Sequence, residues 1–267
     1  MIREPAVAGQ FYPGNARQIE AELDALLQPA GPKRDALAVV VPHAGWMYSG
    51  RTAGILYSQV NIPDRVIMLG PNHHGIGSRY ALFDAGRWRT PVGDARVAEP
   101  LAAALLANCE LLAADLRAHA LEHCLEVQVP MLLRENPAVQ IVPLLIGNGE
   151  PAEWRAISAA IAATVREYGK PVLLLASSDL NHYADQQTSN RKDRLALDAV
   201  VALNEDRLLQ VVNDEDISMC GVVPTYIVLV AAKQLGARRA EVLDYRTSGD
   251  VSGDYSAVVG YGAVAIW

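Results

Sequence analysis

Three apolar stretches of the sequence are each followed directly by polar side chains that can hold a metal ion or move a proton. The stretches are ALAVVV at 36–41, RVIMLG at 65–70 and PVLLLAS at 171–177, and the polar residues after them are His43, Asn72, His73, His74, Asp179, Asn181 and His182. In an open α/β sheet, ligands bind at the carboxyl ends of the strands. If the three stretches form parallel strands, we expect these residues to line one edge of the sheet.

Histidine is the commonest metal ligand among protein side chains, and a carboxylate or a cysteine thiolate can complete such a site. Cys220, in SMCGVVPTY, lies just before an expected helix whose Pro224 suits the first turn. Because a helix N-terminus stabilises a thiolate, we interpret Cys220 as a ligand or a nucleophile. Asp179 and His182 are candidates for proton transfer or for orienting the ligands.

Each of these residues also has an ordinary structural interpretation. A single histidine after a strand is more often a hydrogen-bonded loop residue than a ligand, and only one of two adjacent histidines easily faces a common site. Asp179 can cap a helix. Cys220, like Cys109 and Cys124, can be a small buried apolar residue. The functional interpretation therefore rests on the joint arrangement and on no single residue.

A separate motif must be weighed against this arrangement. His119, Glu122 and His123 spell H-x-x-E-H, the motif of the inverted zinc peptidases. On a helix, His119 and His123 would share a face. Since short motifs arise by chance and this one follows a polar stretch, we favour a surface or supporting role for it.

Strand-like stretches alternate with helical patterns along the chain. Besides the three stretches above, strands are predicted at 139–147, within 80–93, and in the closing stretches AEVLDYRTS and SAVVGYGAVAIW. Helices are predicted near 50–60, 98–108, 122–135, 151–168, 190–204 and 221–236. Continuous apolar strands separated by helices predict an α/β fold, with a largely parallel or mixed central sheet and helices on both faces. No repeat or linker interrupts the pattern, so we expect a single domain over 1–267.

Composition excludes several classes of protein. The net charge of −7 argues against unaided binding to nucleic acid or to anionic lipid. No apolar run reaches the ~18 residues of a membrane helix. Three scattered cysteines without a CxxC pair exclude a disulfide framework and a zinc ribbon. The first residues lack the apolar core of a signal peptide, so the cytoplasm is the expected location.

Six blocks of the sequence, taken in order, resemble the Memo family. They are REPAVAGQFYP, VPHAGWMYSG, LGPNHHG, EHCLEVQVP, SSDLNHY and CGVVPTY. Bacterial and archaeal members of this family are called AmmeMemoRadiSam system protein B, and the resemblance runs from residue 3 to about residue 262. It implies a fold similar to the catalytic subunit of class III extradiol dioxygenases, which are non-haem iron enzymes.

The resemblance also implies roles for individual residues. In the family, the histidine of HAG, the second histidine of the HH pair and the cysteine of CG form a metal site, which corresponds here to His43, His74 and Cys220. The family's D-x-x-H pair lines the same pocket, the first histidine of the HH pair is adjacent, and the EH block supplies a further histidine. The expected catalytic residues are therefore Asp179, His182, His73 and His123.

The expected ligand set differs from that of the dioxygenases, because iron oxygenases use two histidines and a carboxylate, whereas Cys220 takes the carboxylate's place. The softer thiolate favours an iron or copper ion, with zinc as another candidate. We therefore expect a cytoplasmic metal-binding protein with a redox or oxygen-related role. The resemblance implies that it works beside the radical-SAM protein and the AMME-region protein of the same system.

Three alternatives remain open from the sequence. The first is a dioxygenase that acts on an aromatic diol. The second is a metal-free site in which Cys220, a histidine and Asp179 form a nucleophilic set. The third is a non-catalytic adaptor whose pocket binds a peptide, as some Memo relatives are thought to bind phosphotyrosine peptides. Arg51 and Arg79 lie near the motifs but are weak support for it.

Overall fold

Parallel strands at the centre of the sheet place the expected strand ends side by side. The computed structural model describes residues 1–28 and 31–267. The central strands, in spatial order, are β8 (Gln140–Ile146), β3 (Arg65–Pro71), β9 (Leu173–Ser177) and β2 (Ala38–Val41), each parallel to the next. Their residues are almost all buried, as continuous apolar strands require when helices cover both faces. Their carboxyl ends therefore share one edge.

Other strands extend this core, so the sheet is mixed. β6 (Gly93–Val97) pairs in parallel with β8, and β12 (Val258–Ile266) pairs antiparallel with β2. The remaining strands are β1 (Ile2–Arg3), β4 (Tyr80–Leu82), β5 (Arg87–Thr90), β7 (Ala113–Ala114), β10 (His182–Ala184) and β11 (Ala240–Thr247). The described residues form a sheet of 12 strands.

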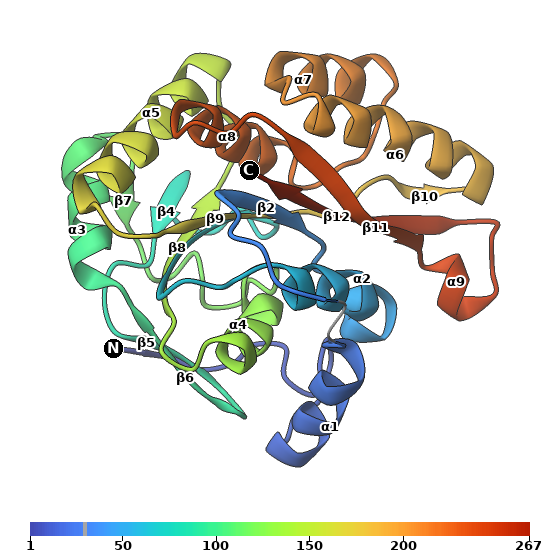
Figure 1. Cartoon of the computed structure of the whole chain (residues 1–267), viewed down its shortest axis with the longest axis horizontal. Coiled ribbons are helices and arrows are strands. Elements are labelled where there is room, and N and C mark those ends of the chain that lie inside the picture. Colours follow the sequence, from blue (N-terminus) through green and yellow to red (C-terminus); the bar gives the residue numbers. More distant parts are fainter. Residues whose placement is uncertain (29–30) are drawn as a thin grey trace.

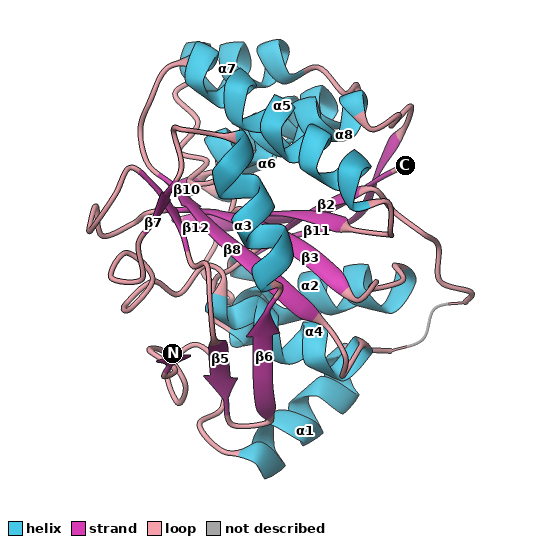
Figure 2. Cartoon of the chain, turned by 90° about the vertical axis from the view of Figure 1, so that its left-hand side faces the viewer, coloured by secondary structure: helices cyan, strands magenta, loops and turns pink. Residues whose placement is uncertain are grey.

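Helices cover both faces of the sheet (Figures 1 and 2). One layer contains α5 (Pro151–Tyr168), α6 (Gln186–Val201), α7 (Glu205–Asp214) and α8 (Val222–Gln234), and the other contains α1 (Ala16–Leu26), α2 (Trp46–Gln59) and α4 (Val129–Glu135). α3 (Glu99–Asn108) packs against α5 and β8, and α9 (Gly249–Ser252) is a single turn. The α/β prediction is confirmed. Among the described helices, none is both long and apolar enough to span a membrane.

Two predicted helices begin at other residues in the structure. The helix predicted over 122–135 is a turn followed by the 3₁₀ helix η1 (Glu126–Gln128) and then α4, because the Glu122 side chain accepts the N–H groups of His123 and Cys124 and so holds a turn there. The helix predicted over 190–204 begins at Gln186, because Asp185 caps it by accepting the N–H of Thr188.

A buried carboxyl group joins α6 to the sheet. Asp193 is fully buried; its side chain accepts the backbone N–H of Asn181 at 2.8 Å and the hydroxyl of Tyr245 at 2.7 Å. Gly260 on β12 leaves room for it, since a Cβ there would lie 1.9 Å from Asp193 Oδ2. This contact holds the segment after β9, which contains Asp179 and His182.

This carboxyl group predicts a dependence of stability on pH. Burial raises the pKa of Asp193 from 3.8 to about 6, so the folded protein holds the proton more tightly than the unfolded chain. The resulting stabilisation is fully present below pH 3.8 and is lost as the pH rises through about 6. When the pH is lowered from 7 to 4.5, the unfolding free energy of wild type should therefore rise by about 2 kcal/mol relative to that of Asp193→Asn. Urea denaturation of both proteins at the two pH values measures this difference. Parallel pH profiles for the two proteins would contradict this assignment.

Candidate metal centre

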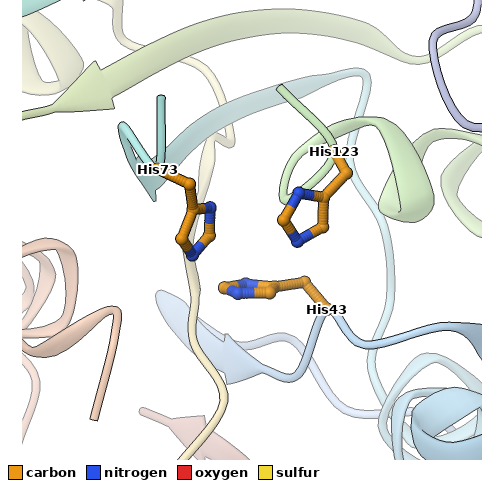
Figure 3. A group of neighbouring side chains, drawn as sticks. All are labelled: His43, His73 and His123. Atoms are coloured by element: carbon orange, nitrogen blue, oxygen red, sulfur yellow. The ribbon is translucent and has the colours of Figure 1, made fainter. Parts of the chain in front are cut away.

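Three imidazole rings meet at the carboxyl edge of the parallel strands (Figure 3). One metal-binding atom from each of His43, His73 and His123 lies within 4.8 Å of those of the other two. The ring centroids of His73 and His123 are 4.7 Å apart, and the His43 ring stands edge-on to both at 5.2 Å and 5.4 Å. We call these three residues the histidine cluster.

The topology explains why these histidines converge. His43 follows the end of β2 and His73 follows the end of β3, and both strands pair with β9. His123 comes from the turn before η1, and this turn contacts the end of β3 through Cys124, whose Sγ lies 3.3 Å from the carbonyl oxygen of Pro71. Gly70 permits this close approach, because a Cβ there would lie 2.5 Å from Cys124 Sγ.

Cys220 lies beside the histidine cluster. Its Sγ is 3.2 Å from His43 Nε2, at the turn that precedes α8. Gly221 brings this turn against the end of β9, since a Cβ there would lie 2.4 Å from the Cβ of Ser178 and 2.5 Å from the carbonyl oxygen of Ser177. A side chain at residue 221 would push the thiol away from His43.

The protonation states of these groups suit metal binding. Burial lowers the pKa of His43 to about 3 and that of His123 to about 4, so both rings are neutral near pH 7 and keep a lone pair. The thiol of Cys220 differs from expectation. Burial, and secondly the nearby Asp179, raises its pKa. These two effects outweigh the stabilisation of a thiolate expected from the N-terminus of α8. Without a metal ion the group is a thiol, and a bound cation would displace its proton.

Glu122 orients two members of the histidine cluster. Its buried carboxylate accepts the backbone N–H and the Nδ1–H of His73, both at 2.8 Å, and the N–H groups of His123 and Cys124 at 3.0 and 3.1 Å. Burial alone would raise the pKa of Glu122, but the hydrogen bonds that it accepts, first of all from His73, take it below the ordinary value. Because an ionised carboxylate only accepts, His73 carries its proton on Nδ1 and leaves Nε2 free.

The structure brings His73 into the cluster, whereas His74 was the expected ligand. His74 is exposed, and its Nε2 lies 3.2 Å from the carbonyl oxygen of Leu121. Glu122 binds both the amide and the ring of His73, which turns that ring toward His43. His74, the next residue in the chain, is not part of the histidine cluster.

The other expected residues have supporting positions. Asp179 is buried and accepts the backbone N–H groups of His43 and Ala44 at 2.7 and 3.3 Å, so it fixes the main chain after β2 and does not contact the imidazole of His43. Burial raises its pKa. His182 binds Ser218 through its ring and its amide.

The H-x-x-E-H residues do not form a peptidase site. Residues 119–125 form a turn and no helix, so the two histidines of the motif do not share a helix face. The His119 ring is buried against Phe83 and Trp88, and its Nε2 lies 3.0 Å from the carbonyl oxygen of Ala81. His123 alone joins the cluster.

An open cleft leads to the site. It has a volume of about 690 Å³, and its wall includes both His73 and Cys220. Other lining residues are Asn72, Arg79, Asn148, Met219 and Val223. A small molecule in this cleft would reach His73 and Cys220 directly, whereas His43 lies behind them with 2% of its surface exposed.

The donor set fits a transition-metal ion. Ligands at about 2.1 Å from one ion can lie at most about 4.2 Å apart, so cluster atoms within 4.8 Å of one another need only a small closure. Neutral imidazoles and a thiolate are the donors that iron, copper and zinc accept, whereas magnesium and calcium prefer oxygen. The carboxylate of Glu122 is already occupied by four N–H groups.

Sequence reasoning did not identify every residue that forms this site. Glu122 stands out in the sequence only as part of the peptidase-like motif and of the EH block. Nothing in the sequence marks Ser177, whose Oγ lies 3.0 Å from His43 Nδ1, or Gln128, which donates to that Oγ. Their signal was weak: Ser177 is the last residue of β9, and Gln128 is a polar residue within an apolar block. Both are fully or almost fully buried, and burial is not visible in one sequence.

Comparison with known proteins gives consistent matches. The family model described as "Memo-like protein" matches residues 3–265. "MEMO1 family protein MK0963" of Methanopyrus kandleri is 38% identical over 278 residues, covering 99% of this chain and 98% of that protein. A MEMO1 family protein of Sulfolobus acidocaldarius is 39% identical over 280 residues, covering 98% of each. A crystal structure of an uncharacterized Escherichia coli K12 protein has a TM-score of 0.55 at 15% identity, covers 85% of this chain and 98% of that one, and shows a similar fold alone.

Replacing the carboxylate of Glu122 tests its role in orienting the histidines. In Glu122→Gln, an amide NH₂ would face N–H donors that now point at the carboxylate, so we expect a loss of at least about 2 kcal/mol of unfolding free energy. The exposed Glu110→Gln is the control and should change stability by less than about 0.5 kcal/mol. Urea denaturation of the metal-free proteins measures both. A Glu122→Gln protein as stable as wild type would show that these hydrogen bonds do not hold the site together.

Proposed function

The chain belongs to the Memo family, and we propose that it binds one redox-active transition-metal ion, iron or copper, at the histidine cluster. The proposed ligands are the Nε2 atoms of His43 and His73 and the Sγ of Cys220, with His123 as an additional donor. The observation that supports this most strongly is the convergence of three imidazoles within 4.8 Å of one another, with a thiol 3.2 Å from His43.

The protein's own residues would prepare the site for the ion. Glu122 holds His73 with Nε2 free, Asp179 fixes the main chain at His43, and Gly221 brings Cys220 to the cluster. The cleft admits a small substrate to His73 and Cys220. When bound, the ion would supply Lewis-acid and one-electron chemistry at the base of this cleft.

An oxygen-related redox role fits this donor set better than cleavage of an aromatic diol. Iron extradiol chemistry is associated with a site of two histidines and one carboxylate, and Glu122 already accepts four N–H groups. A fold similar to that of the dioxygenases does not by itself imply that this protein catalyses the same reaction. Catechol-dependent oxygen uptake by the iron-loaded protein would support the dioxygenase alternative.

The metal-free nucleophile has less support. Cys220 and His43 are 3.2 Å apart, as a catalytic pair requires, but Asp179 binds backbone N–H groups and does not orient the imidazole. The raised pKa of Cys220 also opposes a thiolate nucleophile. We further propose that the protein acts in the cytoplasm beside a radical-SAM protein and an AMME-region protein; the family resemblance alone supports this.

The adjacent histidines offer a matched test of the metal site. Protein purified anaerobically without a tag should carry near-stoichiometric iron or copper by mass spectrometry, or take up added Fe²⁺ or Cu⁺. His73→Ala and Cys220→Ser should each lower the affinity at least tenfold, because each removes a ligand. His74→Ala should bind like wild type, since its Nε2 lies 3.2 Å from the carbonyl oxygen of Leu121 and its ring is not part of the histidine cluster.

Either of two results would overturn the assignment. One is a wild-type protein that carries no metal and refuses both added ions. The other is loss of binding in His74→Ala with retention in His73→Ala, which would restore the ligand set expected from the sequence.

A further inference from the structure

Behind His43, on the side away from the cleft, lies a buried chain of polar side chains. It consists of Tyr57, Gln128 and Ser177, of which no more than 1% is exposed in any residue. These residues come from α2, η1 and β9. The direction of each hydrogen bond among them is determined, because two of their partners are backbone carbonyl oxygens, which can only accept.

The first carbonyl fixes the orientation of Gln128. The oxygen of Pro42 is 2.8 Å from one terminal atom of the Gln128 amide, and this atom must be Nε2 because a carbonyl oxygen needs a donor. The amide oxygen of Gln128 then accepts from the hydroxyl of Tyr57 at 2.9 Å. The second proton of Nε2 points to Ser177 Oγ at 3.2 Å.

The second carbonyl fixes the proton of Ser177. Its hydroxyl lies 2.7 Å from the carbonyl oxygen of Cys124, so it donates its only proton there. Ser177 Oγ is left with lone pairs alone, and Gln128 already donates to one of them. His43 Nδ1 lies 3.0 Å from the same oxygen and can be bonded only if it carries a proton.

We propose that Ser177 and Gln128 are positioning residues that hold His43 as the tautomer protonated on Nδ1, so that the lone pair of Nε2 faces the cluster and Cys220. The hydrogen bond made by one ring nitrogen of a histidine determines which nitrogen carries the proton. The opposite tautomer would set a ring lone pair against an oxygen with no proton to offer. The consequence for metal affinity rests on the proposed function, but the tautomer itself does not.

This arrangement treats the two strand-end histidines differently. His73 donates Nδ1–H to the carboxylate of Glu122, whereas His43 donates to a neutral hydroxyl that is itself aligned by an amide. A neutral partner fixes the ring without adding a charge at the most deeply buried ligand. This environment therefore favours the neutral imidazole of His43, which can donate the lone pair of Nε2 to a metal ion.

The tautomer can be read directly in the metal-free protein. With ¹⁵N-labelled histidine at pH 7, two-dimensional ¹⁵N–¹H NMR separates protonated from unprotonated ring nitrogens, and His43→Gln identifies the His43 signals. We expect a protonated Nδ1 and an unprotonated Nε2 at His43. A protonated Nε2 in the wild-type protein would overturn the proposal without any variant.

Ser177→Ala and its control test the cause. Removing the acceptor should shift His43 toward the Nε2–H tautomer and weaken Fe²⁺ or Cu⁺ binding at least tenfold. Ser158→Ala removes a similarly buried hydroxyl that donates to the carbonyl of Trp154 at 2.7 Å, and should leave both readouts unchanged. Gln128→Leu should shift the tautomer in the same direction as Ser177→Ala.

The two readouts separate the two hypotheses. An unchanged tautomer in Ser177→Ala would refute the positioning role. If wild type and all variants bind no metal while the tautomer shifts as expected, the proposed function fails and the positioning role stands. If Ser177→Ala does not fold, the wild-type spectrum and Gln128→Leu still decide the matter.

Discussion

The site depends on a buried, ionised carboxylate that must be fully hydrogen-bonded. Leaving a charge unpaired in a protein interior is costly, and Glu122 has 1% of its surface exposed. Its partners come from both the segment after β3 and its own turn, through His73 and the amides of His123 and Cys124. The carboxylate is satisfied only when these segments meet, so its hydrogen bonds hold His73 and His123 beside each other.

A second buried acid in the same block connects the N-terminal segment to this region. Glu126 accepts the backbone N–H groups of Ala6 and Val7, the hydroxyl of Tyr12, and a hydrogen bond from Arg3 at 2.7 Å. The Arg3 guanidinium also donates to the carbonyl oxygens of His119 and Glu122. These hydrogen bonds join REPAVAGQFYP to EHCLEVQVP, although the two blocks are far apart in the chain.

The sequence indicated which edge of the sheet carries the site, because apolar strands ending in His43, His73 and Asp179 define it without knowledge of the packing. The resemblance implies His74 as the ligand, whereas the structure brings His73 into the cluster, because adjacent residues differ only in orientation and Glu122 decides that orientation from a distant turn. The apolar spacing also predicts a helix that includes His123. In the structure the Glu122 side chain accepts the N–H groups of His123 and Cys124, so a turn stands where the first turn of that helix was expected. Cys220 was expected to be a thiolate, but burial outweighs the helix N-terminus.

The balance of charge in the metal-free site favours a particular kind of ion. His43 and His123 are neutral and Cys220 is a thiol, and the nearby carboxyl groups of Glu122 and Asp179 already accept backbone N–H groups. When an ion binds, the Cys220 thiol loses its proton, which adds one negative charge to the site. A buried cation is most easily accommodated when its charge is small and its ligands are soft, and nitrogen and sulfur donors suit Cu⁺ and Fe²⁺ better than a hard cation of the same charge. The donor set and the low charge of the pocket therefore point in the same direction.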